Sequence, residues 1–294
     1  MDYKSILVEI GADDGCRDRL RAAAVLAFRF GAHLTGVTTT GVRVGHVRGV
    51  EDGARRAVLV HEQLRAQAFG HANLMRDIMA ETGHAVSWSH EMVEDDPARA
   101  LTQLACSADL LLLARRPPWS GMPPLVADPA EAVLLDCGRP VMVVPANAPP
   151  LLGGHVLIAW NDSPEAARAV ADALPLLGHA AMVTVVCASD AGGAGPIVRY
   201  LASHGIEATV RPVPGAESEP RMQAAHACRA AHAAHAAHAR HAEPGEALLR
   251  TARALSADMI VAGCYGHSRM RELAFGGVSR TLLQRATLPL VMSH

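Results

Sequence analysis

Short apolar runs alternate with longer alanine-rich segments along the whole chain. Runs such as Ile6–Ile10, Leu110–Ala114 and Val141–Val144 contain almost no polar residue, which is typical of strands buried on both faces of a parallel sheet. The segments between them, such as Asp18–Phe30, favour helices. Because strands alternate with helices and crossovers are right-handed, the pattern predicts an open, doubly wound α/β sheet.

Five strands are predicted in each half of the chain. In the first half they cover residues 6–10, 32–38, 85–92, 110–114 and 141–144. In the second half they cover residues 156–160, 182–187, 208–213, 259–262 and 290–292. The main helices of the first half are expected at 18–30, 61–82, 97–107 and 129–135, and the second half has only 195–204 in place of the long helix at 61–82.

The chain repeats itself at an offset of about half its length. Three pairs of segments match in the same order: 5–10 with 155–160, 106–114 with 255–263, and 134–144 with 282–292. Such repetition indicates two copies of one fold. The Pro- and Gly-rich stretch at 145–154 is typical of a linker. We therefore expect domains at 1–147 and 152–294, each an open, Rossmann-like, five-stranded parallel sheet flanked by helices.

Composition narrows the function classes. Hydrophobic residues make up 50% and charged residues 19% of the 294 residues, so the chain as a whole is not an extended disordered one. A net charge of −2 and 3% aromatics argue against a nucleic-acid partner. No apolar run approaches the roughly 20 residues of a membrane span. The six cysteines are irregularly spaced, which favours reduced thiols, and we expect a cytoplasmic protein with no membrane partner.

Glycines follow the fourth predicted strand of the second half. Gly263 and Gly266 are separated by two residues, and nine more lead to Gly276, followed by Gly277, Val278 and Ser279. The predicted helix at 280–285 starts directly after them. Backbone amides at a helix N-terminus, with a serine hydroxyl, form a place for a phosphate group. The alternative is a loop that needs tight turns and binds nothing.

A polar turn follows the first strand of the second half. Asn161 lies where the strand ends and could hydrogen-bond to a base or ribose. Asp162 or Ser163 could cap the next helix, with Pro164 in its first turn. The alternative for Asp162 and Ser163 is capping alone.

At this point the chain resembles the universal stress proteins. The resemblance rests on Gly-x2-Gly-x9-Gly with Gly277-Val278-Ser279, on the closing Leu-Pro-Leu-Val-Met strand, and on the turn at Trp160–Glu165. It implies an adenine nucleotide alpha-hydrolase-like fold that binds ATP or AMP, with Mg²⁺ left open. The nucleotide-binding residues that it implies are Asn161, Val186, Ala262, Gly263, Gly266, Gly276, Gly277, Val278 and Ser279.

The chain departs from that family in two ways. In the second half Asn161 replaces the usual Asp, and Gly277 replaces the usual Ser or Thr. In the first half, Gly11 stands where the acidic residue would be, and a proline-rich stretch replaces the glycine pair. Prolines lack the N–H groups that a phosphate needs. We therefore expect the first half to be a degenerate partner that supplies packing surface, with Arg115 and Arg116 solvated. The alternative for these two arginines is contact with an anion.

A histidine run interrupts the second half. His232, His235, His238 and His241 recur every three residues in an insert at about 216–243. Adjacent pairs on a helix could bind Zn, Ni or Cu. A three-residue step turns by about 60° against the helical repeat, so all four cannot face one metal. The alternative is a low-complexity insert that binds nothing.

The resemblance implies regulation in stress response through nucleotide-dependent association. No acid–base or nucleophile–base pair stands at a diagnostic spacing, so at most slow ATP hydrolysis is expected. A homodimer could form by pairing of an exposed final strand at 288–293. Three alternatives stay open: a flavoprotein-like or hydrolase-like relative of the same fold, a metal-buffering protein that uses the histidine run, and a scaffold that binds no ligand.

Overall fold

The computed structural model describes residues 2–40, 53–83, 85–115, 129–146, 148, 153–187, 191–212, 244–264 and 277–294. The strands are β1 (Ser5–Glu9), β2 (His33–Thr39), β3 (Trp88–Val93), β4 (Leu110–Ala114), β5 (Val141–Val144), β6 (His155–Trp160), β7 (Met182–Cys187), β8 (Ala208–Pro212), β9 (Met259–Gly263) and β10 (Leu290–Ser293). The helices are α1 (Cys16–Phe30), α2 (Gly53–Thr82), α3 (Pro97–Ala105), α4 (Pro129–Asp136), α5 (Pro164–Leu177), η2 (Ala191–Ala194), α6 (Gly195–Ser203), α7 (Pro244–Ala254) and α9 (Val278–Arg285).

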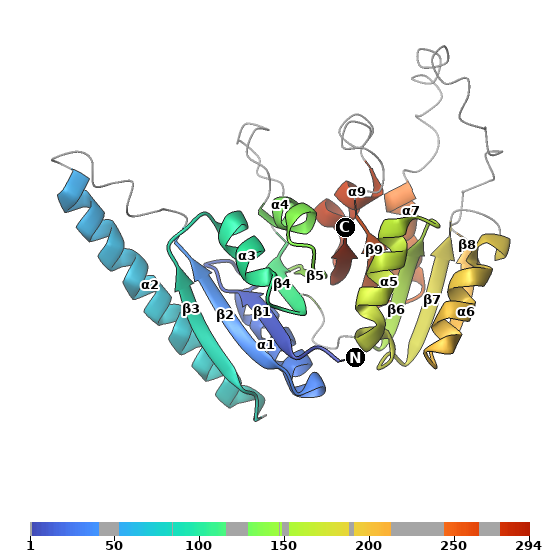
Figure 1. Cartoon of the computed structure of the whole chain (residues 1–294), viewed down its shortest axis with the longest axis horizontal. Coiled ribbons are helices and arrows are strands. Elements are labelled where there is room, and N and C mark those ends of the chain that lie inside the picture. Colours follow the sequence, from blue (N-terminus) through green and yellow to red (C-terminus); the bar gives the residue numbers. More distant parts are fainter. Residues whose placement is uncertain are drawn as a thin grey trace, which may run out of the picture.

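All ten strands belong to one sheet, ordered β3-β2-β1-β4-β5-β10-β9-β6-β7-β8 (Figure 1). Within β1–β5 and within β6–β10 the neighbouring strands are parallel, and β10 runs antiparallel to β5. The predicted α/β class with five parallel strands in each half is confirmed. The two five-stranded units, here called the N-terminal half (β1–β5) and the C-terminal half (β6–β10), join edge to edge into a continuous sheet.

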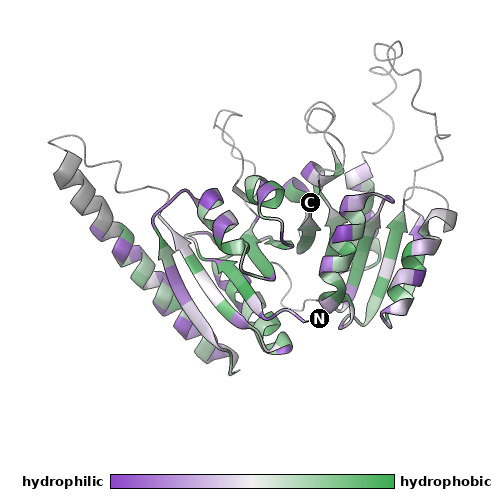
Figure 2. Cartoon of the chain, in the orientation of Figure 1, coloured by the Kyte–Doolittle hydropathy of each residue, from purple (hydrophilic) through white to green (hydrophobic). Residues whose placement is uncertain are grey.

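Helices cover both faces of the sheet. One hydrophobic cluster packs α1, α2, α5 and α6 against one face, and a second cluster packs α3, α4, α7 and α9 against the other. Strands buried on both faces need apolar residues at every position, which explains their unbroken apolar runs. Figure 2 shows hydrophobic strands at the centre and hydrophilic residues on the outer surfaces of the helices.

Each half begins with the same hydrogen-bonded arrangement. Asp109, just before β4, accepts hydrogen bonds through Oδ2 from the backbone amides of Lys4 (2.7 Å) and Ser5 (3.0 Å). Asp258, just before β9, accepts them through Oδ2 from the amides of Gly154 (2.8 Å) and His155 (3.1 Å). Ser5 and His155 therefore hold equivalent positions, which fixes the residue-by-residue match between the two halves.

Contacts beyond the sheet also join the halves. The Tyr3 hydroxyl donates to the Asp172 carbonyl at 2.7 Å, and burial raises the pKa of this phenol. Arg115 Nη1 donates to the Gln284 carbonyl at 2.8 Å. Arg115 therefore bridges β4 and the end of α9, and the expectation that it is solvated was wrong.

The final strand is not an exposed edge. β10 pairs with β9 on one side and with β5 on the other, through Leu290–Val143 and Met292–Val141. The prediction that residues 288–293 are free to pair with a second chain was therefore wrong, because β5 already fills that place. A homodimer stays a prediction, but this strand does not supply its surface.

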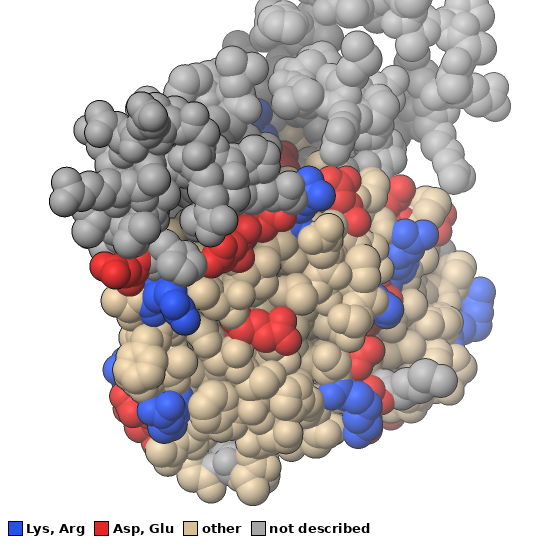
Figure 3. Space-filling model, turned by 60° about the vertical axis from the view of Figure 1, so that its left-hand side comes forward, with Lys and Arg blue, Asp and Glu red and all other residues tan. Residues whose placement is uncertain are grey.

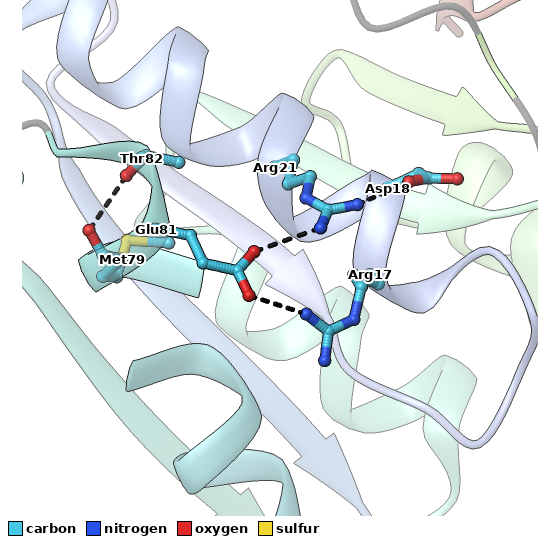
Figure 4. Close-up of polar contacts among 6 residues, drawn as sticks. All are labelled: Arg17, Asp18, Arg21, Met79, Glu81 and Thr82. Carbon is cyan, nitrogen blue, oxygen red and sulfur yellow. Dashed lines mark hydrogen bonds and ion pairs between the residues drawn. The ribbon is translucent and has the colours of Figure 1, made fainter. Parts of the chain in front are cut away.

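An ion-pair cluster fastens α2 to α1 (Figure 4). Glu81, near the end of α2, contacts Arg17 (3.0 Å) and Arg21 (3.1 Å) of α1, and Arg21 also contacts Asp18 (3.2 Å). Hydrogen bonding from Arg21 is the main cause that lowers the pKa of Glu81. These charges are exposed, so their role is to orient the helices rather than to add much stability.

Charges of both signs are mixed on one described face of the molecule. On the face in Figure 3, the described Lys and Arg side chains are interspersed with Asp and Glu. Among the described residues, no helix is both long and apolar enough to span a membrane. The five cysteines in the described ranges are thiols.

Candidate functional site

Three strands of the C-terminal half bring small side chains together at their carboxyl ends. Ala159 on β6 is in register with Val186 on β7 and with Ala262 on β9. All three belong to the cluster that faces α7 and α9. They form a row across adjacent strands, here called the strand-end floor (Ala159, Val186 and Ala262). Ligands of open α/β sheets bind at this end of the strands.

The strand-end floor is low and partly open. Two of its three residues are alanines, whose side chains are single methyl groups. Val186 and Ala262 are 1% and 3% exposed, whereas Ala159 is partly exposed although its strand is flanked by β7 and β9. Sequence reasoning named Val186 and Ala262 but missed Ala159, because an alanine in a strand carries no chemical signal. Only the register identifies it.

The turn between β6 and α5 is shaped by capping. Ser163 is the N-cap of α5, and its Oγ accepts a hydrogen bond from the Ala166 amide at 3.2 Å. Asp162 has a left-handed backbone, with φ of 58°. The capping role proposed for Asp162 or Ser163 therefore falls to Ser163. Asn161 is exposed, and its side chain makes no hydrogen bond within the described part of the chain.

Gly263 lets α5 approach the end of β9. A Cβ atom at this position would lie 2.5 Å from the Ala166 nitrogen and 2.5 Å from the Glu165 carbonyl carbon, which real structures do not tolerate. The first turn of α5 therefore rests directly on the backbone of β9. The Glu165 Oε2 atom is buried here and has no hydrogen-bond partner among the described residues. Gly263 is therefore required for the packing of α5 on β9.

Three further residues predicted to bind a nucleotide, Gly277, Val278 and Ser279, lie at the start of α9. Gly277 is the N-cap of this eight-residue helix, with φ of −56° and ψ of 160°, and it offers no side chain to the first-turn amides. Ser279 lies in the first turn and is 5% exposed, and Val278 is 37% exposed. The helix begins at Val278 rather than at Arg280, so the predicted binding residues Val278 and Ser279 belong to its first turn.

The remaining predicted residues cannot be placed. Gly266 and Gly276, and the metal candidates His232, His235, His238 and His241, lie outside the described residues. Within the described ranges there is no group of three His, Cys, Asp or Glu residues arranged to hold a metal ion. The structure therefore brings together Asn161, Val186, Ala262 and Gly263 around the ends of β6, β7 and β9, and adds Ala159.

Comparisons with known proteins agree with this fold. Residues 154–294 match the sequence model of the Universal stress protein family. A universal stress protein from Archaeoglobus fulgidus DSM 4304 superposes with a TM-score of 0.69 at 15% identity, over 98% of this chain and 97% of that one. A functionally unknown protein from Pseudomonas aeruginosa PAO1 gives a TM-score of 0.55 at 15% identity, over 99% and 92%.

A similarity to a curated protein is confined to a short segment. The stress response protein NhaX of Bacillus subtilis (strain 168) is 36% identical over 50 residues, which are 17% of this chain. The match spans only 30% of the length of NhaX. The two structural similarities, at 15% identity, show that the fold is shared, and they carry no information on activity.

Proposed function

We propose that the chain, whose residues 154–294 match the sequence model of the Universal stress protein family, is a cytoplasmic stress-response regulator that binds ATP or AMP in its C-terminal half, residues 152–294. The observation that carries this proposal is the strand-end floor, which is low and partly open at Ala159. A flat, apolar base needs such a surface, flanked by a few polar groups.

The apolar end of the site suits an adenine ring. Val186 would pack beside the base, and Ala159 and Ala262 would leave room for it above the sheet. Asn161, at the end of β6, carries an exposed amide that can both donate and accept hydrogen bonds. Such a group can bind a base edge or a ribose hydroxyl.

The start of α9 suits a phosphate group. With glycine as N-cap, no side chain of that residue competes for the first-turn amides, and the helix dipole favours an anion. The backbone of Gly277 and the first-turn residues Val278 and Ser279 would hold the phosphates, together with Gly266 and Gly276. Mg²⁺ would accompany ATP as a counter-ion of its phosphates.

Two departures from the family predict a modest affinity. Asn161 lacks the charge of the usual Asp, and Gly277 lacks the hydroxyl of the usual Ser or Thr. Each lost hydrogen bond costs about 1 kcal/mol, or about fivefold in affinity. Without an acid–base pair at the described site, nucleotide-dependent association is the favoured use, with at most slow hydrolysis of ATP.

Isothermal titration calorimetry with ATP and AMP tests the proposal, with Gly277→Asp as the disruptive variant. The backbone angles of Gly277 suit any L-residue, and Asp is a good N-cap, so α9 should keep its structure. Its carboxylate would take the first-turn amides and repel phosphate. We expect affinity for ATP to fall at least tenfold.

Gly277→Ser is the matched control. Serine caps the helix as well but carries no charge, and it restores the hydroxyl that the family usually has. We expect binding as tight as in the parent chain or up to about fivefold tighter. Equal affinity of the Asp variant and the parent chain would refute the assigned phosphate position, and no binding by the parent chain would refute the proposed function.

A further inference from the structure

A buried glutamate lies at the end of the first strand in the N-terminal half. Glu9 is 5% exposed, and its Oε2 atom accepts a hydrogen bond from the Ala114 amide at 3.0 Å. Ala114 is the last residue of β4, the strand beside β1. A buried carboxylate is costly unless it is hydrogen-bonded, so this contact holds the acid in place and joins the ends of the two strands.

Glu9 occupies the position that Ala159 has in the C-terminal half. Ser5 matches His155 through the Asp109 and Asp258 hydrogen bonds, and counting along both strands matches Glu9 with Ala159. Val37, in register with Glu9, matches Val186, in register with Ala159. The same count from Asp109 and Asp258 gives two more pairs: Leu113 with Ala262, and Ala114 with Gly263.

The strand-end floor and the matching row in the N-terminal half differ in the size of their side chains. Where the C-terminal half has Ala, Val and Ala, the N-terminal half has Glu9, Val37 and Leu113. These three are 5%, 0% and 1% exposed. The strand pairing differs as well, because the β1–β4 register ends at Val8–Leu112 whereas the β6–β9 register continues for one more pair. In the N-terminal half, the backbone pairing of β1 and β4 ends at Val8–Leu112, and the Glu9 side chain accepts a hydrogen bond from the Ala114 amide just beyond it.

We propose that the side chains of Glu9 and Leu113 fill the N-terminal crevice, the place at the ends of β1 and β4 that corresponds to the nucleotide site of the C-terminal half. The carboxylate of Glu9 accepts a hydrogen bond from the Ala114 amide at the end of β4, and the Leu113 side chain is larger than that of Ala262, its counterpart in the other half. These two positions then decide which half of the chain accepts a nucleotide. This inference rests on the proposed function for its choice of ligand, but the closure itself does not depend on that ligand.

Introducing the Glu9 and Leu113 side chains at the matching positions of the C-terminal half tests the inference in the full-length chain. We expect Ala159→Glu combined with Ala262→Leu to weaken ATP binding at least tenfold, measured by calorimetry, while far-UV circular dichroism stays unchanged. The control Ala202→Glu adds the same carboxylate at an exposed position of α6, on the other face of the sheet, and should bind ATP within twofold of the parent chain. If the double variant is misfolded, Ala262→Leu alone serves, with an expected loss of at least threefold. Parent-like binding by a folded transplant variant would overturn the inference.

Amide hydrogen exchange tests the closure without any nucleotide. In Glu9→Ala, exchange protection of the Ala114 amide should fall at least tenfold, whereas Glu9→Gln keeps a carbonyl acceptor and should stay within threefold of the parent chain. Unchanged protection in Glu9→Ala would overturn the closure. If the parent chain binds no ATP but Ala114 protection depends on Glu9, the proposed function fails and the closed crevice stands. If the parent chain binds ATP but protection is unchanged, only the closure fails.

Discussion

The ends of β1 and β4 and the ends of β6 and β9 are the same place in two copies of one fold, yet they are built differently. In the N-terminal half, Glu9 and Leu113 cover the strand ends, and an amide of β4 is taken by a side chain. In the C-terminal half, Ala159 and Ala262 leave them low, and Ala159 is partly exposed. On the proposed account, these few side chains close the N-terminal site, where the ladder between β1 and β4 is one pair shorter than the ladder between β6 and β9.

The first helix of each half is also held in different ways. Arg19 of α1 is fully buried, and it donates to both carboxylate oxygens of Asp13 (2.9 and 2.8 Å) and to the Glu9 carbonyl (3.0 Å). The start of α5 is instead held by the Ser163 cap and by its close backbone contact with Gly263. The first helix of the N-terminal half is therefore held by a buried ion pair, and the first helix of the C-terminal half is held by an uncharged cap and close backbone packing.

The largest expected effect comes from breaking that ionic support. Asp13→Ala leaves the buried Arg19 guanidinium without its carboxylate. Losing one partner of a buried pair costs about 3–5 kcal/mol, and because the Asp13 side chain is 36% exposed we expect about 2–3 kcal/mol. Urea unfolding measures the loss.

The matching change in the C-terminal half is Ser163→Ala. Loss of an N-cap costs about 1 kcal/mol, so the Asp13 variant should be the less stable of the two. Equal losses in the two variants would show that the two supports do not differ as described.

The next effect comes from filling the contact between β9 and α5. The Cβ atom of Gly263→Ala would collide with backbone atoms rather than with a flexible side chain. Overpacking of this kind costs about 1–3 kcal/mol, and we expect about 2 kcal/mol together with weaker ATP binding. The unfolding midpoint in urea and calorimetry with ATP report the two effects.

Gly70→Ala in α2 is the control for that change. No atom lies within 4 Å of the added Cβ, and the residue is helical, so the substitution should be neutral or stabilise by up to about 1 kcal/mol. A loss of stability as large as that of Gly263→Ala would contradict the packing explanation.

The smallest effect is a pH dependence of the N-terminal half. The Thr38 hydroxyl lies 3.0 Å from His71 Nδ1 and 2.9 Å from His90 Nε2. Burial is the main cause that lowers the pKa of both histidines below 6.5, Asp13 opposes the shift at His71, and His71 adds to it at His90. The folded state then binds fewer protons than the unfolded state, so stability should fall as the pH drops below about 6.5.

A pH series of urea unfolding checks this expectation against a variant with His71→Gln and His90→Gln. The variant should lose part of the decline between about pH 6.5 and 5, because its side chains do not titrate. An identical decline in both proteins would assign the pH dependence to other groups.

The sequence predicted the strands and the duplication well, because buried parallel strands leave apolar runs that are easy to find. It predicted two sheets rather than one, since the pairing of β5 with β10 joins segments far apart in the chain and leaves no local signal. Arg19 resembles an ordinary surface charge on a helix, and only packing shows that it is fully buried.

The nucleotide-binding role of the site residues stays a prediction, and the sequence indicated the backbone roles of only some of them. Glycines and the capping serine have backbone roles that a motif reveals, so Gly263, Gly277 and Ser163 could be singled out from their spacing. Ala159 and Glu9 matter because of their register with neighbouring strands, which only the folded sheet defines.

A crystal structure of the chain grown with excess ATP tests the account most directly. The account predicts a single nucleotide per chain, with its base over Ala159 and Ala262, its phosphates at the start of α9, and Glu9 still bonded to the Ala114 amide. A nucleotide at the ends of β1 and β4, or none at the ends of β6 and β9, would contradict it.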